Sequence, residues 1–318
     1  MNKAIAPRAG SLTSTAIALC LGAVLLALLA GPLAPTAGAA PRTVHTERSV
    51  YRDILVTEES GRRCLKFAVR REEHDQSCMY TADPQRLVFP YARMMFASLL
   101  VNPKPMRVLM VGLGGGSIPM VMQRLVPGTV VDVVEIDGAV VRLAERYFGF
   151  RQGPAMKVSV QDARVFVRRA LQRRQQYDLI LLDAFTGDYI PEHLMTKEFL
   201  LECRQLLSPN GVLAANTFAI SELFHHESAT YQAAFGELMS LRTRDSLNRI
   251  IVVSRAPLPQ ASVLRTRART VAPAMARHGI EIEQFARDLT SAVNWRRDAR
   301  VLTDQYSPAN LLRQQGGG

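Results

Sequence analysis

The sequence predicts an α/β fold built on a largely parallel sheet, and three observations support this prediction. Apolar runs typical of buried strands alternate with segments of helical periodicity from residue 107 to residue 216. A glycine-rich turn, residues 112–116, separates the first apolar run from the first such segment. Acidic residues follow several of the apolar runs, at the edge of the sheet where ligands bind in parallel α/β folds.

Residues 107–137 carry the clearest signal. The apolar run 108–111 predicts a buried strand, residues 118–125 after Ser117 predict a helix, and the run 130–134 predicts a second strand that ends at Glu135 and Asp137. This order is typical of a nucleotide-binding unit, in which glycines let the backbone approach the ligand and the acid accepts hydrogen bonds from ribose hydroxyls. Ser117 stands where the dinucleotide fingerprint has its last glycine, which favours a nucleoside without pyrophosphate, such as an S-adenosyl compound, over NAD.

The remaining elements are expected in regular order. Before the glycine turn we expect strands over 49–57 and 64–69, with a turn at Ser60 and Gly61, and then a helix from Asp83 to about Leu100. After it we expect helices over 138–148, 163–174, 192–207 and 222–239, strands over 157–160, 177–182 and 212–216, and an antiparallel pair over 241–246 and 249–254. Asp162 and Asp183 then lie at strand ends beside Glu135 and Asp137.

The chain divides by composition into four parts. Residues 1–40 combine Lys3 and Arg8, an apolar core and a small-residue cleavage pattern at 37–39, which indicates a signal peptide or an N-terminal anchor. We therefore expect a periplasmic or secreted protein, or one anchored in the inner membrane; a misassigned start would leave it cytoplasmic. Residues 43–102 form a small β-hairpin domain with a connecting helix, 103–260 the nucleoside-binding domain, and 261–318 a basic helical extension.

The net charge of +11 over 318 residues is high, but no nucleic-acid-binding motif accompanies it. We interpret the charge as a solvated basic surface and expect no specific nucleic-acid partner. Cys203 fits a helix core, whereas Cys64 and Cys78 flank the predicted hairpin and are either a disulfide or two buried thiols. No cysteine spacing suggests zinc, and adjacent His225 and His226 point in different directions on a helix, so we expect no metal.

Residues 48–255 resemble the spermidine synthase group of aminopropyltransferases, which share the Rossmann-like class I fold of S-adenosylmethionine-dependent methyltransferases. The resemblance lies in Gln76-Ser77, the glycine turn 112–116, and the segments 134–137, 162–163, 177–183 and 193–199. It implies an N-terminal β-hairpin domain before the Rossmann-like domain, and a homodimer.

The resemblance also implies roles for matched residues. The nucleoside of decarboxylated S-adenosylmethionine, or of S-adenosylmethionine, would contact Gln76, Gly112, Gly114, Gly116, Glu135, Asp162 and Ala163. Asp183 would accept the proton of the attacking amine, because a protonated amine must lose a proton before it attacks the carbon next to the sulfonium. Tyr91 and Asp188 would contact the amine substrate, a diamine such as putrescine.

Three departures from the family pattern leave the reaction open. Gly115 replaces an Asp of the glycine motif, Thr186 replaces a second active-site acid with Asp188 two residues on, and Ala92-Arg93 replaces a His-Glu pair. The sequence therefore supports an aminopropyltransferase, with two alternatives: an S-adenosylmethionine-dependent methyltransferase, and a non-catalytic protein that binds a nucleoside or polyamine.

Overall fold

A computed structural model describes Met1 and residues 41–69, 72–184, 190–219, 222–308 and 311–312. The chain divides into two units, Met1–Ala40 and Pro41–Gly318, and the elements below belong to the second. The predictions that concern the leader, Thr186 and Asp188 lie outside the described residues.

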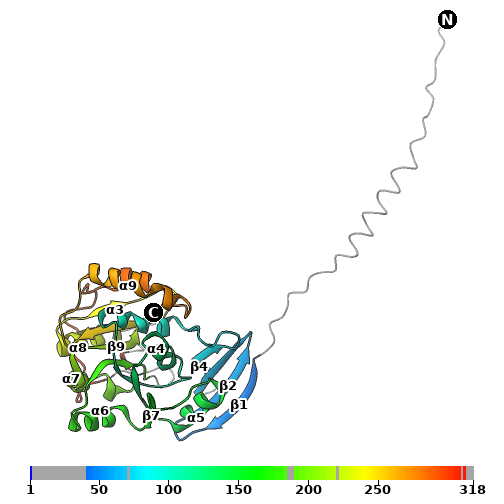
Figure 1. The fold of residues 1–318 in the computed structure, drawn as a ribbon, viewed down its shortest axis with the longest axis horizontal. Coiled ribbons are helices and arrows are strands. Elements are labelled where there is room, and N and C mark those ends of the chain that lie inside the picture. Colours follow the sequence, from blue (N-terminus) through cyan, green and yellow to red (C-terminus); the bar gives the residue numbers. More distant parts are fainter. Residues whose placement is uncertain (2–40, 70–71, 185–189, 220–221, 309–310, 313–318) are drawn as a thin grey trace. The chain divides into compact units, whose positions relative to one another are not determined.

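The second unit begins with an antiparallel sheet of four strands in the order β1-β2-β3-β4 (Figure 1). These strands are β1 Arg42–Arg48, β2 Asp53–Glu59, β3 Arg62–Val69 and β4 Glu72–Tyr80. The hairpin turn at Ser60 and Gly61 is present, both residues having positive φ angles. The strand predicted from residue 49 instead begins at Asp53, because Arg52 N and Tyr51 N donate to the Ser49 hydroxyl in a tight bend.

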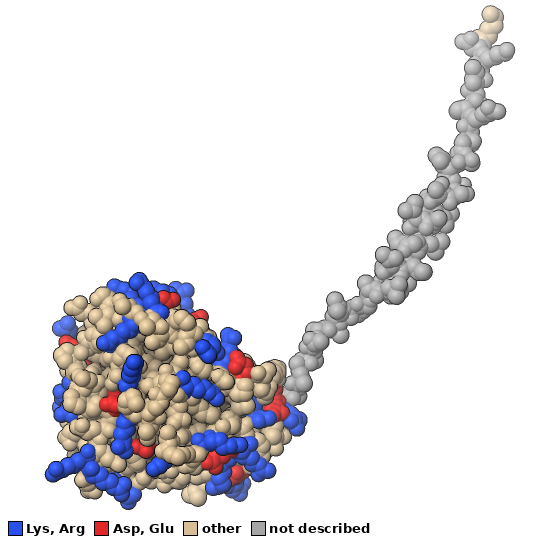
Figure 2. Space-filling model, viewed as in Figure 1, with Lys and Arg blue, Asp and Glu red and all other residues tan. Residues whose placement is uncertain are grey.

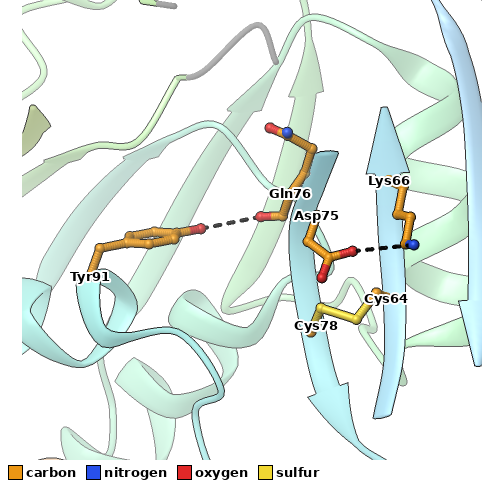
Figure 3. Close-up of a disulfide and its surroundings, with 6 residues drawn as sticks. All are labelled: Cys64, Lys66, Asp75, Gln76, Cys78 and Tyr91. Carbon is orange, nitrogen blue, oxygen red and sulfur yellow. Dashed lines mark hydrogen bonds and ion pairs between the residues drawn. A yellow bond between two sulfur atoms is a disulfide. The ribbon is translucent and has the colours of Figure 1, made fainter. Parts of the chain in front are cut away.

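Cys64 and Cys78 are paired opposite each other on β3 and β4 and form a disulfide (Figure 3). Cys203 is a free, buried thiol, as expected.

The helix predicted from Asp83 is wrong at its start. The helical segment consists of α2 Pro90–Met94, a 3-10 turn η1 Met95–Ala97 and α3 Ser98–Val101. Leu87 N donates to His278 O at 3.0 Å and Leu87 pairs with Met79 of β4, so tertiary contacts occupy this backbone. The helix begins at Pro90 because proline fits the first helical position, where its missing N–H is not needed.

A seven-stranded sheet in the order β10-β11-β9-β8-β5-β6-β7 forms the centre of the unit. The five strands from β9 to β7 are mutually parallel, and β11 and β10 extend the sheet in antiparallel fashion. Their bounds are β5 Arg107–Val111, β6 Val130–Glu135, β7 Met156–Val160, β8 Tyr177–Leu182, β9 Leu207–Phe218, β10 Met239–Leu241 and β11 Asn248–Ser254. The predicted α/β fold with a mostly parallel sheet is therefore confirmed.

Helices cover both faces of this sheet, so alternate residues of each central strand enter different cores. Val108 and Met110 of β5 pack in one cluster with side chains of α4, α5, α9 and α10, whereas Leu109 and Val111 pack in another with α6, α7 and α8. The helices are α4 Ser117–Leu125, α5 Gly138–Tyr147, α6 Ala163–Gln172, α7 Lys197–Leu206, α8 Leu223–Phe235, α9 Ala261–Ala276 and α10 Ile282–Asp288.

Three predicted boundaries need correction. The helix predicted over 192–207 is divided into η2 Glu192–Leu194 and α7, because the Thr196 hydroxyl caps α7 by accepting from Phe199 N at 3.3 Å. Helix α8 ends at Phe235 because Gly236 adopts φ 88°. The antiparallel closing pair exists, but its first strand is β10, which ends where the predicted strand began.

Lys and Arg side chains are distributed over the visible face of residues 41–318, with fewer acidic side chains between them (Figure 2). Among the described residues, no helix is both long enough and apolar enough to cross a bilayer.

Candidate active site

A cavity of about 570 Å³ lies at the carboxyl ends of β5, β6 and β8 and is closed on one side by β4 and α2. Its volume is within the usual range of small-molecule sites, about 300–1,000 Å³. Four strand-end acids line it: Glu135, Asp137, Asp162 and Asp183. The order of the parallel strands brings these residues together, as expected for a ligand site in an open α/β sheet.

The glycine turn forms one wall of the cavity and requires glycine at three positions. Gly112, Gly114 and Gly116 all have positive φ angles, between 54° and 89°. A Cβ on Gly112 would lie 2.3 Å from the backbone oxygen of Asp183, and one on Gly116 would lie 2.5 Å from the Phe150 ring. The absence of a side chain at Gly112 therefore lets the ends of β5 and β8 approach each other.

Glu135 is fixed by two backbone donors. Its Oε2 accepts from Leu113 N at 2.9 Å, and its Oε1 accepts from Asp137 N at 3.0 Å. Burial raises the pKa of Glu135, and these backbone bonds oppose that effect. Each carboxylate oxygen keeps a second lone pair, so the side chain can still accept hydrogen bonds from a vicinal diol in the cavity.

Asp162 and Asp137 both cap helices. Asp162 Oδ1 accepts from Val165 N at 3.0 Å at the start of α6, and Asp137 Oδ1 accepts from Ala139 N at 2.9 Å at the start of α5. The second oxygen of Asp162 lies 2.8 Å from Nε2 of His193. Burial acts to raise the pKa of Asp162, but the bonds to Val165 and His193 outweigh it, and the pKa is lowered.

Asp183 follows β8 and lines the cavity together with Glu135. Asn216 Nδ2 donates to its Oδ1 at 2.9 Å. Burial raises the pKa of Asp183 to about 7; the Asn216 bond opposes this effect and the charge of Glu135 adds to it. A carboxylate with a pKa near neutrality is well matched to proton acceptance at neutral pH.

The N-terminal sheet and α2 contribute Gln76 and Tyr91. Figure 3 shows the Tyr91 phenol pointing from α2 toward β4, where it donates to Gln76 O at 3.2 Å. Burial, and next the charge of Asp183, raises the pKa of Tyr91 well above its usual value, so the phenol stays protonated. Gln76 and Cys78 both line the cavity, which places the disulfide beside its wall.

The sequence analysis missed two polar residues of the site, Asn216 and His193. Asn216 is a polar residue near the end of an otherwise apolar run, which was an available signal. His193 belongs to a segment singled out for its resemblance, but nothing in the sequence indicated its contact with Asp162. Ala163 lines the cavity, as do Gly112 and Gly114.

A side chain at Gly115 would lie between Phe148 and Ser77, a residue that lines the cavity. A Cβ on it would lie 2.9 Å from Phe148 Cδ1 and 3.0 Å from Ser77 Oγ. Phe148 is buried, so an acidic side chain does not fit at this position without displacing the ring.

One cluster of potential metal ligands occurs in the described part of the chain, formed by Cys64, Asp75 and Cys78. The two sulfurs are bonded to each other, so neither is a thiolate available to a metal.

Known proteins with similar sequences indicate the family of this chain. Residues 88–244 match the model of the spermine/spermidine synthase domain. A polyamine aminopropyltransferase from Vibrio vulnificus is 47% identical over 293 residues, covering 91% of this chain and 98% of that protein. The bovine eEF1A lysine and N-terminal methyltransferase is 33% identical over 132 residues, covering 37% of this chain and 19% of its own.

Two solved structures support the fold. A probable spermidine synthase from Corynebacterium glutamicum superposes with a TM-score of 0.63 at 21% identity, covering 82% of this chain and 96% of that one. Human methyltransferase-like protein 13, in complex with SAH, superposes with a TM-score of 0.55 at 25% identity, covering 59% of this chain and 93% of that one. The Rossmann-like methyltransferase fold is thus confirmed, and the chain belongs to the spermine/spermidine synthase family of polyamine aminopropyltransferases.

Proposed function

We propose that this protein transfers an aminopropyl group from decarboxylated S-adenosylmethionine to a diamine such as putrescine. The position of Asp183 gives this proposal its strongest support, together with the family to which the chain belongs. Its carboxylate lies at the carboxyl edge of the sheet, in the same cavity as the glycine turn and Glu135, with a pKa raised to about 7.

The nucleoside would bind between the glycine turn and the strand-end acids. Glu135 is suited to the ribose hydroxyls because two backbone N–H groups already fix its carboxylate. Asp162, with Ala163 beside it, is suited to the amino group of adenine, since a carboxylate that bonds Val165 N and His193 retains free lone pairs. Gln76 would reach the nucleoside from β4, and Gly112 and Gly114 would bring the backbone close to it; Gly116, predicted with them, packs against Phe150 instead of lining the cavity.

In the reaction, the amine nitrogen attacks the propyl carbon bound to the sulfonium, and the carbon–sulfur bond breaks with its electron pair going to sulfur. Methylthioadenosine leaves as a neutral thioether, and the proton on nitrogen passes to the Asp183 carboxylate. Asn216 holds that carboxylate by donating to it, and Tyr91 borders the same part of the cavity. We assign Tyr91 and Asp188 to the amine substrate, Asp188 on the resemblance alone.

The test is a transfer assay with the purified protein, decarboxylated S-adenosylmethionine and putrescine, in which mass spectrometry measures methylthioadenosine and spermidine. We expect both products from the wild type, and a loss of at least about 100-fold in Asp183→Asn, the usual scale for removing a general base. Asp298→Asn, at an acid whose side chain is 87% exposed, is the matched control and should keep full activity. Equal turnover by wild type and Asp183→Asn would refute the assignment.

A methyltransferase is the second candidate. Gly115 favours it, because a donor with a carboxylate would be repelled by the acid that the family carries there, and the bovine relative is a methyltransferase. Calorimetric titration separates the two enzymes: preference for S-adenosylmethionine over its decarboxylated form favours the methyltransferase. Failure to bind either donor or methylthioadenosine would favour the non-catalytic alternative.

We also propose that residues 1–40 direct export, that the protein works outside the cytoplasm or at the inner membrane, and that it is a homodimer. A fusion to alkaline phosphatase, which is active only after export, tests the first part. Light scattering on the purified protein tests the dimer; a monomeric mass would refute it.

A further inference from the structure

A second, much smaller cavity of about 20 Å³ lies directly behind the active-site wall. It lies between the ends of β8 and β9 and the helices α7 and α8, and most of its lining is apolar, including Leu182, Leu194 and Phe199. Asn216 and Glu227 are the two lining residues with amide or carboxylate groups. A volume of this size holds one water molecule, provided that polar partners are present.

Each of these two lining residues has a buried oxygen without a hydrogen bond from any residue that the structure describes. These oxygens are Oδ1 of Asn216 and Oε2 of Glu227. Buried polar atoms are nearly always hydrogen-bonded, so two unpaired oxygens on residues that line one water-sized cavity point to a shared partner. Asn216 Oδ1 is an acceptor, whereas burial raises the pKa of Glu227 to about 8, so its carboxyl group accepts when ionised and donates when protonated.

Arg249, the charged neighbour of Glu227, does not donate a hydrogen bond to Glu227 Oε2. Arg249 Nη2 lies 3.6 Å from Glu227 Oε2, beyond hydrogen-bond distance, and the two side chains are only 1% and 3% exposed. The guanidinium donates instead to Thr217 Oγ1, Ser228 Oγ and Phe224 O. Arg249 therefore partly neutralises Glu227 but leaves Oε2 available.

We propose that one buried water bridges Asn216 Oδ1 and Glu227 Oε2, and that through this bridge Glu227 is a positioning residue for Asp183. A water molecule has two O–H groups and two lone pairs, so it can donate to Asn216 Oδ1 and pair with either form of the Glu227 carboxyl group. The other end of the same amide, Asn216 Nδ2, donates to Asp183 Oδ1 at 2.9 Å. The chain of contacts therefore runs from Glu227 through water and Asn216 to Asp183, and its importance for turnover rests on the proposed function of Asp183.

The bridge fixes which way the Asn216 amide faces. An amide rotated by 180° would present its oxygen to the Asp183 carboxylate, placing two acceptors together, and would turn its NH₂ group toward the cavity. A water that donates to Oδ1 opposes this rotation. The donor thus held on Asp183 favours the ionised carboxylate, which is the form that accepts a proton.

Among the described residues, few charged or titratable groups surround this chain of contacts from Glu227 to Asp183. Glu135 and Tyr91 face Asp183 from β6 and α2, while Arg249 and Tyr231 face Glu227 from β11 and α8. Glu135 raises the pKa of Asp183 by its charge, so a change at the small cavity acts on Asp183 chiefly through Asn216.

The test fills the small cavity by a substitution that leaves Glu227, Asn216 and Asp183 unchanged. Ala215 lines the cavity and packs in the cluster with Leu182, Leu194 and Phe199, so Ala215→Val adds two methyl groups where the water would sit. Ala214→Val is the matched control: it makes the same change on the same strand at an equally buried residue that packs in the opposite core. Glu227→Gln keeps an oxygen that accepts from the water.

The readout is the pKa of Asp183, measured by carboxyl-carbon NMR on protein labelled in aspartate and assigned with Asp183→Asn. This measurement does not depend on turnover, so it separates the present inference from the proposed function. We expect Ala215→Val to raise the Asp183 pKa by about one pH unit, the scale of losing one hydrogen bond to a carboxylate. Ala214→Val and Glu227→Gln should leave it within about 0.3 unit of the wild type, the smaller part of that scale.

A crystal structure of the wild type gives a second measurement that needs no variant. We expect one ordered water within hydrogen-bond distance of Asn216 Oδ1 and Glu227 Oε2. An empty cavity in that crystal structure would overturn the inference. So would equal Asp183 pKa values in Ala215→Val and Ala214→Val.

Discussion

Replacing Asp183 by Asn should stabilise the protein, and increasingly so as the pH rises. In an unfolded chain an Asp ionises near 3.8, whereas burial raises the pKa of Asp183 in the folded protein to about 7. Between these values the unfolded state has released its proton and the folded state has kept it, so the free energy of unfolding falls as the pH rises. At about 1.4 kcal/mol for each pH unit, the interval corresponds to about 4 kcal/mol.

Asn is a close match in shape and keeps an oxygen for the hydrogen bond from Asn216, so the difference between the two proteins isolates the ionisation. Urea unfolding of wild type and Asp183→Asn at pH 4, 5.5, 7 and 8.5 measures it. We expect similar stabilities at pH 4 and an advantage of about 4 kcal/mol for Asp183→Asn at pH 8.5. Asp298→Asn, at an exposed site, should show no such trend. A difference between wild type and Asp183→Asn that stays constant across this pH range would refute the reasoning.

Three further substitutions test other parts of the structure. Gly112→Ala and Gly149→Ala both place a side chain on a residue with positive φ, which costs about 1–3 kcal/mol. Only Gly112→Ala adds a clash, because its Cβ would lie 2.3 Å from the backbone oxygen of Asp183, whereas Gly149 has open space. Urea unfolding should show the larger loss for Gly112→Ala, and equal losses would refute the close approach. Replacing Cys64 and Cys78 by Ala opens a link between residues 14 apart in sequence and should lower the unfolding free energy by about 3 kcal/mol; an unchanged value in non-reducing urea titrations would mean that the pair is not bonded. Arg164→Met removes the partner that Glu202 and Asp304 share at 3.1 Å and 2.7 Å; because Glu202 keeps Arg168 at 3.0 Å and Asp304 is partly exposed, we expect a loss of about 1–3 kcal/mol. Thermal unfolding within a degree of wild type would contradict this.

The strand-end acids could be predicted from the sequence because strand order and direction dictate where they lie. Once 108–111, 130–134 and 177–182 are assigned as parallel strands, Glu135 and Asp183 must lie at one edge of the sheet, next to the glycine turn. The contact between Asp183 and Asn216 needed one more fact, the register of β8 on β9. Leu182 is paired with Ala215, so the following residues, Asp183 and Asn216, are neighbours.

Other features depend on partners too far away in sequence for any local pattern to reveal. The start of α2 at Pro90 depends on His278, whose carbonyl takes the Leu87 N–H. The contact between His193 and Asp162 joins side chains 31 residues apart in sequence. The lack of space for a side chain at Gly115 depends on Phe148, a buried ring that follows α5. Periodicity predicts the existence of the elements, and these tertiary contacts decide their ends.

Three acids in this site have pKa values raised by burial: Glu135, Asp183 and Glu227. The folded protein would be more stable if each of these carboxyl groups were neutral. Ionised carboxylates near the cavity therefore lower its stability, as is common at functional sites. The arrangement suits a cationic ligand, because a sulfonium or ammonium group beside Asp183 favours the ionised carboxylate that burial disfavours. Proton and cation therefore compete for Asp183, and binding of a charged donor should tighten as the pH rises through about 7. Neutral methylthioadenosine, once formed, loses that advantage, which favours its release after transfer.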